Sequence, residues 1–159
     1  KHVQVPEAMA YPRPLNGRVP LLVGGSGERR TLRLAAQYAD ACNLFGDAAT
    51  VRRKIEVLHR HCAEVGRDPA AGQVTHLSTA LVARDVTELE AEVARRRPPR
   101  RAAAWTAATN PGTVEDHLLR VRALREAGVQ HLIVSLVGVW DSPAVERCGE
   151  VIAAVRSPR

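Results

Sequence analysis

Four consecutive residues, Gly24, Gly25, Ser26 and Gly27, carry the clearest chemical signal in the sequence. They lie between a short apolar run and a segment with helical spacing. Glycine permits positive φ angles and lets backbone N–H groups approach a ligand closely. The first turn of a following helix adds a partial positive charge. This combination favours the binding of an anion such as phosphate, and an empty tight turn between strand and helix is the alternative.

The glycine-rich turn matches neither of the two common phosphate-binding motifs. A P-loop ends in Gly-Lys-Ser or Gly-Lys-Thr, which this turn lacks. Arg29 and Arg30 stand where a dinucleotide-binding fingerprint has its third glycine. The residues by themselves therefore favour an anion site but do not identify the ligand.

Asn43 is a second candidate, because it lies at the end of the next predicted strand. In parallel α/β folds, the carboxyl ends of the strands carry the ligands. We therefore consider Asn43 a residue that lines a ligand pocket. An amide that only satisfies the backbone of a turn is the alternative.

The remaining polar residues form no recognisable catalytic pattern. His76, His131 and Ser135 lie on predicted strands, where a single histidine is usually a hydrogen-bonded structural group. Three further histidines lie on predicted helices without the spacing of a metal site, namely His59, His61 and His117. We predict no metal site, and the spacing identifies no nucleophile, acid or base.

Apolar strands alternate with amphipathic helices along the chain. The residue pattern predicts strands at 19–23, 40–45, 74–83 and 129–136, and helices at 28–39, 48–65, 86–97, 113–127 and 144–155. Residues 1–18 are predicted to be irregular, residues 110–112 to form a turn, and residues 102–109 fit no single state. The alternation predicts an α/β fold in which helices cover a parallel sheet.

Composition excludes disorder and a membrane-spanning protein. The 159 residues are 45% apolar and 25% charged, with a mean hydropathy of −0.18. No apolar run reaches the roughly 18 residues that a transmembrane helix needs. The three cysteines, Cys42, Cys62 and Cys148, are odd in number and lack metal-binding spacing. They predict free, buried thiols in the reducing cytoplasm.

The basic charge of the chain is local. The net charge is +6, and the segment 95–101 contains five arginines, so the rest of the chain is close to neutral. We predict a solvated Arg-rich loop at 95–101. No aromatic residue interleaves this segment, which disfavours the base stacking of a nucleic-acid site.

Several segments together resemble one family, the bacterial luciferase-like monooxygenase superfamily. Residues 19–28 and the stretch Ala39-Asp40-Ala41-Cys42-Asn43 are similar to its flavin- or coenzyme F420-dependent oxidoreductases. Residues 50–69, which end in Gly66-Arg67-Asp68-Pro69, resemble the next helix of that family. The stretch from Asn110-Pro111-Gly112-Thr113 to Leu136 is similar to its final helix and strand. The resemblance covers residues 12–155.

This resemblance implies a fold larger than the chain. The family fold is a (β/α)₈ TIM barrel, which needs about 250 residues. Residues 1–159 are therefore expected to be a single partial domain, the C-terminal part of an incomplete barrel. Lys1 stands where a complete chain begins with Met, which agrees with a truncated protein. Because an open half-barrel exposes strand edges and an apolar face, we expect it to need the missing N-terminal half or self-association.

The resemblance also implies a cofactor and a reaction. Gly24, Gly25, Ser26 and Gly27 would bind the cofactor phosphate through backbone amides, and Asn43 would line the cofactor pocket. The implied cofactor is coenzyme F420, with flavin mononucleotide (FMN) as the alternative. The implied activity is hydride transfer with a small-molecule substrate, or monooxygenation with reduced FMN. Because the substrate-contacting residues of the family lie mostly in the missing half, the catalytic residues are unknown and the chain alone is expected to be inactive.

Two other functions are compatible with the sequence. The chain could be an inactive barrel remnant that acts in assembly. The segment 95–101 could instead make it an Arg-rich nucleic-acid-binding module, which we favour least.

Overall fold

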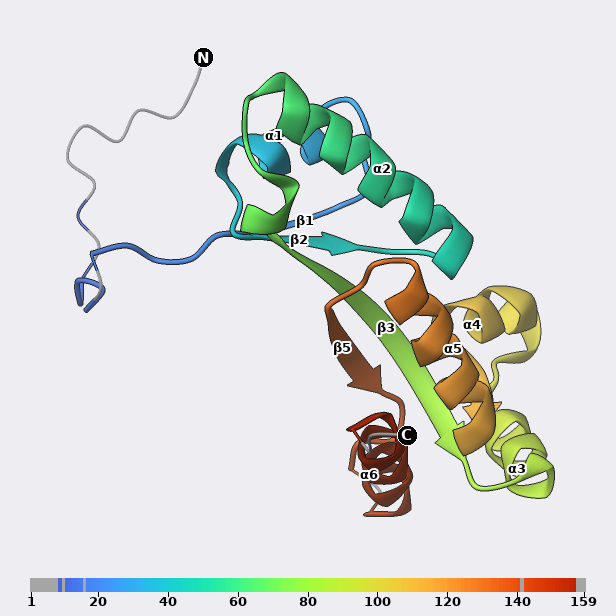
Figure 1. Cartoon of the computed structure of the whole chain (residues 1–159). Coiled ribbons are helices and arrows are strands. Elements are labelled where there is room, and N and C mark those ends of the chain that lie inside the picture. The colour runs from blue at the N-terminus through green and yellow to red at the C-terminus, as the bar shows by residue number, and fades with distance from the viewer. Residues whose placement is uncertain (1–8, 10, 16, 141, 157–159) are drawn as a thin grey trace.

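The computed structural model describes residues 9, 11–15, 17–140 and 142–156 of the chain (Figure 1). Within these residues the chain forms a sheet of five parallel strands. The strands are β1 (Leu22–Gly24), β2 (Ala41–Leu44), β3 (Gln73–Ala83), β4 (Pro111–Thr113) and β5 (His131–Leu136). They follow the order β1-β2-β3-β4, and β5 also pairs with β3. Every pair is parallel, which confirms the predicted α/β class.

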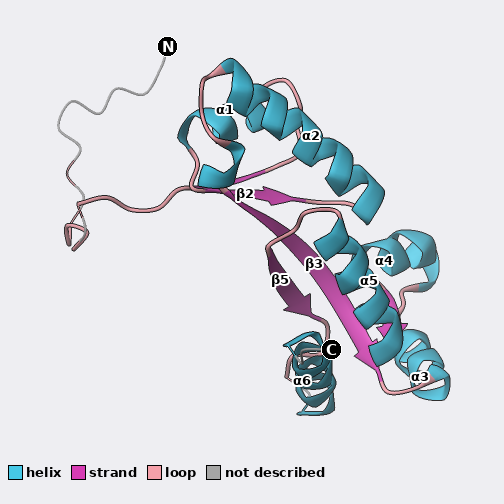
Figure 2. Ribbon diagram, viewed as in Figure 1, coloured by secondary structure: helices cyan, strands magenta, loops and turns pink. Residues whose placement is uncertain are grey.

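Helices connect the strands, as expected for successive parallel strands (Figure 2). They are α1 (Thr31–Tyr38), α2 (Ala48–Glu64), α3 (Val86–Arg96), α4 (Ala102–Thr109), α5 (Val114–Glu126) and α6 (Ser142–Arg156). Two short 3₁₀ helices lie at Pro69–Ala71 and Pro99–Arg101. The Asp47 carboxylate caps α2, and Thr113 with Asp116 forms a reciprocal capping box on α5.

The strand and the helix around the glycine-rich turn are shorter than predicted. β1 begins at Leu22 instead of Val19, because the N–H of Leu21 donates to the Asp40 carboxylate (2.7 Å) rather than to a neighbouring strand. α1 begins at Thr31, and the residues just before it form a turn. The connection between β1 and α1 is consequently longer than the sequence indicated.

The C-terminal half contains one more strand than predicted. Of residues 110–112, which were predicted as a turn, Pro111 and Gly112 instead belong to β4, which pairs with residues 81–83 at the end of β3. Residues 102–109, which fitted no single state, form α4. β5 begins at His131 rather than Val129, because the N–H of Val129 still bonds to the end of α5.

The prediction of one Arg-rich loop at 95–101 is wrong, whereas the predicted helix at 86–97 is confirmed as far as Arg96. Arg95 and Arg96 form the last turn of α3, and residues 99–101 form a 3₁₀ helix. The Glu92 carboxylate accepts hydrogen bonds from Arg95 Nη2 (2.8 and 2.9 Å) and from Arg96 Nε (2.6 Å). Ion pairs at these spacings stabilise a helix, so α3 continues almost to the prolines. Of residues 1–18, those that the structure describes belong to no helix or strand.

The hydrophobic core lies between the sheet and its helices in two clusters. The larger cluster joins β2 and the start of β3 to α1, α2 and α5, with Leu32, Leu44 and Val51 at its centre. The smaller cluster joins the end of β3 to α5 and α6 through Ala80, Val82 and Val151. Cys42 and Cys62 are buried as free thiols in the larger cluster, as predicted, and burial raises the pKa of Cys42 to about 11. Cys148 is a free, half-buried thiol.

The opposite face of the sheet exposes apolar side chains. Leu77 of β3 and Ile133 of β5 are paired in register, and both are 37% exposed. Leu22 of β1 is also exposed. Since side chains alternate between faces along a strand, these residues lie opposite the core positions. The described part of the chain therefore leaves this second sheet face uncovered around Leu22, Leu77 and Ile133.

His117 of α5 is a buried titratable group that joins α5 to the sheet. Its Nε2 donates to the backbone oxygen of Leu81 at 3.1 Å. Burial lowers the pKa of His117 below its ordinary value of 6.5, and the nearby Arg120 acts in the same direction. The hydrogen bond to Leu81 and the charge of Asp116 oppose this shift without cancelling it.

We expect the free energy of unfolding to decrease as the pH falls below 6.5, the ordinary pKa of histidine. The unfolded chain takes up a proton at that pKa, whereas folded His117 stays neutral to lower pH, so the unfolded state binds more protons. The stabilisation is fully present above this range. Urea unfolding at several pH values measures the effect, and His117→Gln, which keeps a donor for Leu81, should remove this component. A variant with the same pH profile as the original chain would contradict the assignment.

Candidate functional site

The glycine-rich turn joins the carboxyl end of β1 to the start of α1. Gly24 is the last residue of β1, and the N–H of Gly25 donates to the backbone oxygen of Asn43 at 3.1 Å. The N–H of Leu32 donates to the backbone oxygen of Gly27 at 3.0 Å. These two bonds fix the turn against β2 on one side and α1 on the other.

Two of the glycines are required by the geometry. Gly25 has a φ of +136°, and a Cβ at this position would lie 3.0 Å from Thr31 Cγ2. A Cβ on Gly27 would lie 2.9 Å from Thr31 Oγ1. Gly24 differs, because a Cβ there would meet nothing within 4 Å. The backbone thus passes too close to Thr31 for side chains at positions 25 and 27.

The turn holds polar groups without a partner. The hydroxyl oxygen of Ser26 is buried and has no hydrogen bond. Among the described residues, none accepts from the backbone N–H groups of Ser26, Gly27 or Glu28. A buried polar group without a partner costs free energy, which a bound acceptor recovers. An anion with several oxygens fits this set of donors, and the first turn of α1 adds a partial positive charge.

Asn43 lies beside the turn, but its side chain bonds elsewhere. The residue is buried in β2, and its backbone oxygen receives the Gly25 N–H. Its Oδ1 accepts a hydrogen bond from the Thr75 hydroxyl of β3 at 2.8 Å. The structure therefore brings Asn43 and the turn together through the backbone. A contact between the Asn43 amide and a cofactor stays a prediction.

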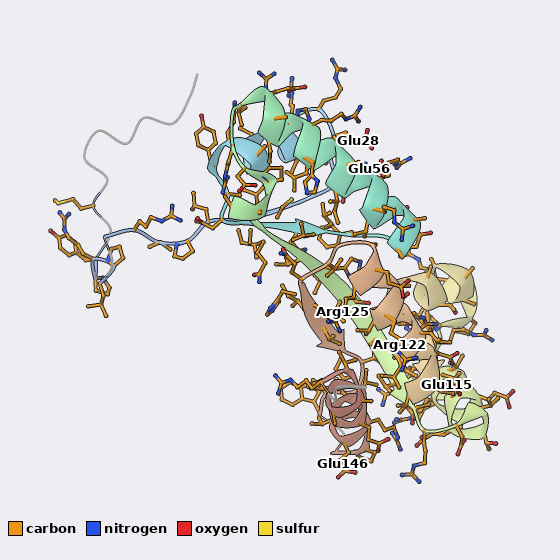
Figure 3. All side chains as sticks on the ribbon, viewed as in Figure 1. Glu28, Glu56, Glu115, Arg122, Arg125 and Glu146 are labelled. Atoms are coloured by element: carbon orange, nitrogen blue, oxygen red, sulfur yellow. The ribbon has the colours of Figure 1, made fainter. Side chains whose placement is uncertain are left out.

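Two residues of α2 brace the turn, and sequence reasoning missed them. Lys54 Nζ donates to the Glu28 carboxylate at 2.6 Å, and His61 Nε2 donates to the backbone oxygen of Glu28 at 2.8 Å, so Glu28 lies against α2 (Figure 3). The hydrogen bond and the charge of Lys54 lower the pKa of Glu28. Lys54 and His61 are seven residues apart on one face of a helix, which was the only signal available in the sequence.

The other polar candidates lie apart from the turn. His76 is buried in β3, and its Nε2 donates to the backbone oxygen of Gly46 at 2.9 Å, as expected for a structural histidine. His131 and Ser135 are exposed on β5. Within the described residues, no three His, Cys, Asp or Glu side chains gather to hold a metal ion. No described helix is long and apolar enough to cross a membrane.

The parallel sheet and the helices that alternate with its strands are the architecture of an incomplete TIM barrel. The family profile described as luciferase-like monooxygenase matches residues 1–144, and the chain therefore belongs to that family. The predicted family and fold class are thereby confirmed. A search of curated proteins found no match.

Solved structures share this fold at low sequence identity. An F420-dependent secondary alcohol dehydrogenase, in complex with an F420-acetone adduct, superposes with a TM-score of 0.67 and 19% identity, covering 88% of this chain and 50% of that one. The coenzyme F420 dependent tetrahydromethanopterin reductase from Methanopyrus kandleri gives 0.64 and 16%, covering 87% and 51%. The oxygenating constituent of 3,6-diketocamphane monooxygenase from Pseudomonas putida, in complex with FMN, gives 0.57 and 17%, covering 84% and 46%. The chain spans about half the length of these structures.

Proposed function

We propose that this chain is the cofactor-phosphate-binding part of an oxidoreductase that transfers hydride between a small organic substrate and coenzyme F420. FMN, with monooxygenation, is the alternative cofactor. The observation that carries the proposal is the unpartnered Ser26 hydroxyl in a glycine turn at the end of β1. Structural neighbours that use F420 or FMN support both cofactors.

The chain's own residues bind and orient in this proposal. A bound cofactor supplies the hydride chemistry. The Ser26 hydroxyl and the N–H groups of Ser26 and Gly27 donate to the phosphate, and α1 adds its partial positive charge. The Glu28 carboxylate would repel a phosphate, but Lys54 neutralises it and holds it against α2. The electrostatics of the turn therefore remain favourable to an anion.

The exposed apolar sheet face supports a covering partner. Leu22, Leu77 and Ile133 lie where the rest of a barrel would pack, and the chain spans about half of its structural neighbours. We propose that the missing barrel half, or a second copy of the chain, covers this face and completes the substrate site. The residues that act on the substrate then belong to that covering part.

Binding of FMN and riboflavin tests the phosphate assignment. Because riboflavin lacks the phosphate, we expect the 159-residue chain to bind FMN about tenfold more tightly. Ser26→Ala should weaken FMN binding by a factor of about 3 to 10, the usual effect of one lost hydrogen bond, and should leave riboflavin binding unchanged. Quenching of flavin fluorescence measures both affinities, and coenzyme F420 is titrated in the same way.

Equal affinities for FMN and riboflavin would show that the turn does not bind the cofactor phosphate. If neither FMN nor coenzyme F420 binds, the second candidate function, an inactive remnant that acts in assembly, is favoured. The exposed apolar face is the observation that supports this candidate. Sedimentation of the chain at increasing concentration would then show self-association.

A further inference from the structure

A cleft lies at the carboxyl ends of β3 and β5. Its volume is about 480 Å³, within the usual range for small-molecule sites. Leu81 and Val82 at the end of β3 and Val137 after β5 line it, together with α3 and the first turn of α6. β2 separates β3 from β1 in the sheet, so this cleft is distinct from the glycine-rich turn. It shares with that turn the sheet edge where parallel folds bind ligands.

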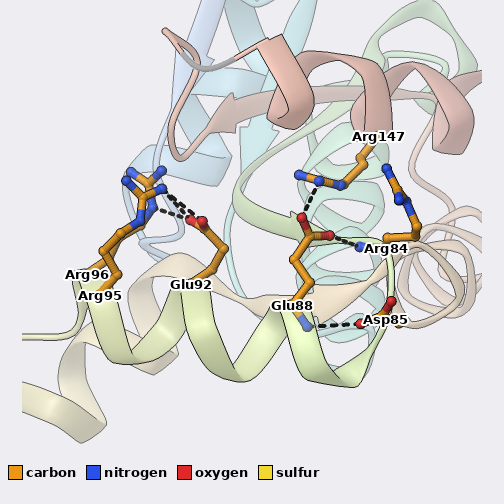
Figure 4. Close-up of polar contacts among 7 residues, drawn as sticks. All are labelled: Arg84, Asp85, Glu88, Glu92, Arg95, Arg96 and Arg147. Atoms are coloured by element: carbon orange, nitrogen blue, oxygen red, sulfur yellow. Dashed lines mark hydrogen bonds and ion pairs between the residues drawn. The ribbon is translucent and has the colours of Figure 1, made fainter.

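Charged side chains from α3 and α6 dominate the lining of this cleft (Figure 4). The charged residues are Glu88, Glu92, Arg95, Arg96 and Arg147. The Glu92 carboxylate accepts from two arginines, and the Glu88 carboxylate accepts from Arg147 and from the backbone N–H of Arg84. Both acids are thus engaged, and three guanidinium groups face two carboxylates. The lining carries one excess positive charge.

Arg147 has a buried hydrogen-bond donor that lacks an acceptor. The residue is only 8% exposed, and one of its Nη2 hydrogens bonds to Glu88, which comes from a helix 59 residues earlier in the chain. Its Nε is buried and has no hydrogen-bond partner. A buried guanidinium normally has its donors satisfied, because an unpaired buried donor destabilises the fold. A ligand that supplies an acceptor would satisfy the free Nε donor of Arg147.

Two further features favour an organic anion in this cleft. Pro143 and Ala144, in the first turn of α6, line the cleft, so the positive end of a 15-residue helix adds to the arginine charges. Trp140 also lines the cleft and is 95% exposed, so it offers an aromatic surface to an apolar part of the ligand.

We propose that this cleft binds the carboxylate or phosphate group of a small organic anion, with Arg147 as the principal donor. Glu88 and Glu92 hold the guanidinium groups in place and compete with the ligand for them. The inference that the anion is a substrate group rests on the proposed function. The anion site itself rests only on the cleft and its charges.

Titration of the 159-residue chain with inorganic phosphate, and separately with acetate, tests the site. The Nε–H resonance of Arg147 in ¹⁵N spectra, assigned by its loss in Arg147→Lys, should shift in a saturable manner. Arg147→Lys keeps the positive charge but loses the fork of donors, so affinity for phosphate, measured by calorimetry, should fall about tenfold. Glu88→Gln keeps an acceptor for Arg147 and removes a competing charge, so affinity should rise about three- to tenfold.

Arg122→Gln is the matched control, because Arg122 is exposed on α5 and does not line the cleft. It should leave phosphate affinity unchanged. An absent shift at Arg147, or equal losses in Arg147→Lys and Arg122→Gln, would overturn the proposal. Phosphate affinity is expected to fall in Arg147→Lys and to rise in Glu88→Gln. If the two residues form a purely structural ion pair, both variants would leave phosphate affinity unchanged.

Competition identifies the source of the anion. Phosphate binding at Arg147 that persists at saturating coenzyme F420 assigns the site to a substrate group, whereas displacement by coenzyme F420 but not by FMN assigns it to the anionic tail of the cofactor. Ser26→Ala should leave the Arg147 shift intact in both cases. A failure of the turn to bind a cofactor phosphate is therefore distinguishable from a failure of this cleft.

Discussion

An aspartate at position 25 is expected to weaken FMN binding by a factor of roughly 5 to 1,000 beyond the effect of an asparagine at the same position. Both side chains must adopt the φ of +136° and approach Thr31, so both incur the same backbone strain of about 1–3 kcal/mol. Only aspartate adds a negative charge beside the donors of the turn. Two like charges about 4 Å apart repel by about 1 kcal/mol in water and about 4 kcal/mol near a protein surface.

The comparison of Gly25→Asp with Gly25→Asn separates charge from strain. FMN affinity is measured by flavin fluorescence and stability by urea unfolding, and the two variants should unfold alike. Gly24→Ala is the control for substitution within the turn, because its Cβ would meet nothing within 4 Å. Equal FMN affinity in the aspartate and asparagine variants would show that no phosphate lies at this turn.

Truncation of Leu32 is expected to cause the largest loss of stability. Leu32 is 0% exposed in α1 and packs in the larger core cluster with Leu44 and Val51. A buried Leu→Ala change typically costs about 2–5 kcal/mol, since it removes apolar contacts and leaves a cavity. Domains are stable by only about 5–15 kcal/mol, so Leu32→Ala removes a large part of the total. Urea unfolding followed by circular dichroism measures the loss.

Leu34→Ala is the matched control, because Leu34 lies in the same helix and is 51% exposed. The change in helix propensity is the same for both variants, so the difference between them reports burial alone. We expect Leu34→Ala to change the free energy of unfolding by no more than about 0.5 kcal/mol. Equal losses at the two positions would mean that α1 does not pack on the sheet through Leu32.

Signals between neighbouring residues in the sequence were sufficient to predict most of the fold. Asp47 and Gly66 are examples, since an N-cap and a left-handed glycine act within one turn of the helix whose ends they mark. Alternating strands and helices identified the parallel sheet, and the combination of residues 19–28, 39–43, 50–69 and 110–136 identified the family. The position of the glycine-rich turn was predictable for the same reason, since strand, turn and helix are adjacent in sequence.

Contacts between distant segments could not be predicted. β4 forms because residues 81–83 offer an unpaired edge, which residues 111–113 do not reveal on their own. The bond from Lys54 to Glu28 and the pair of Arg147 with Glu88 join different helices, so they depend on tertiary packing. The helical state of Arg95 and Arg96, by contrast, was predicted within the helix at 86–97, and Glu92, three and four residues earlier, supports it.

The long strand β3 restricts how sequences of this type can change in length. Residues 73–76 pair with β2, residues 75–80 with β5, and residues 81–83 with β4. One inserted residue in the middle of β3 would turn Ala80 and Val82 from the core to the opposite face, because side chains alternate with a period of two. Homologous sequences should therefore conserve the length of β3. Insertions should accumulate instead at residues 97–101, which belong to no strand.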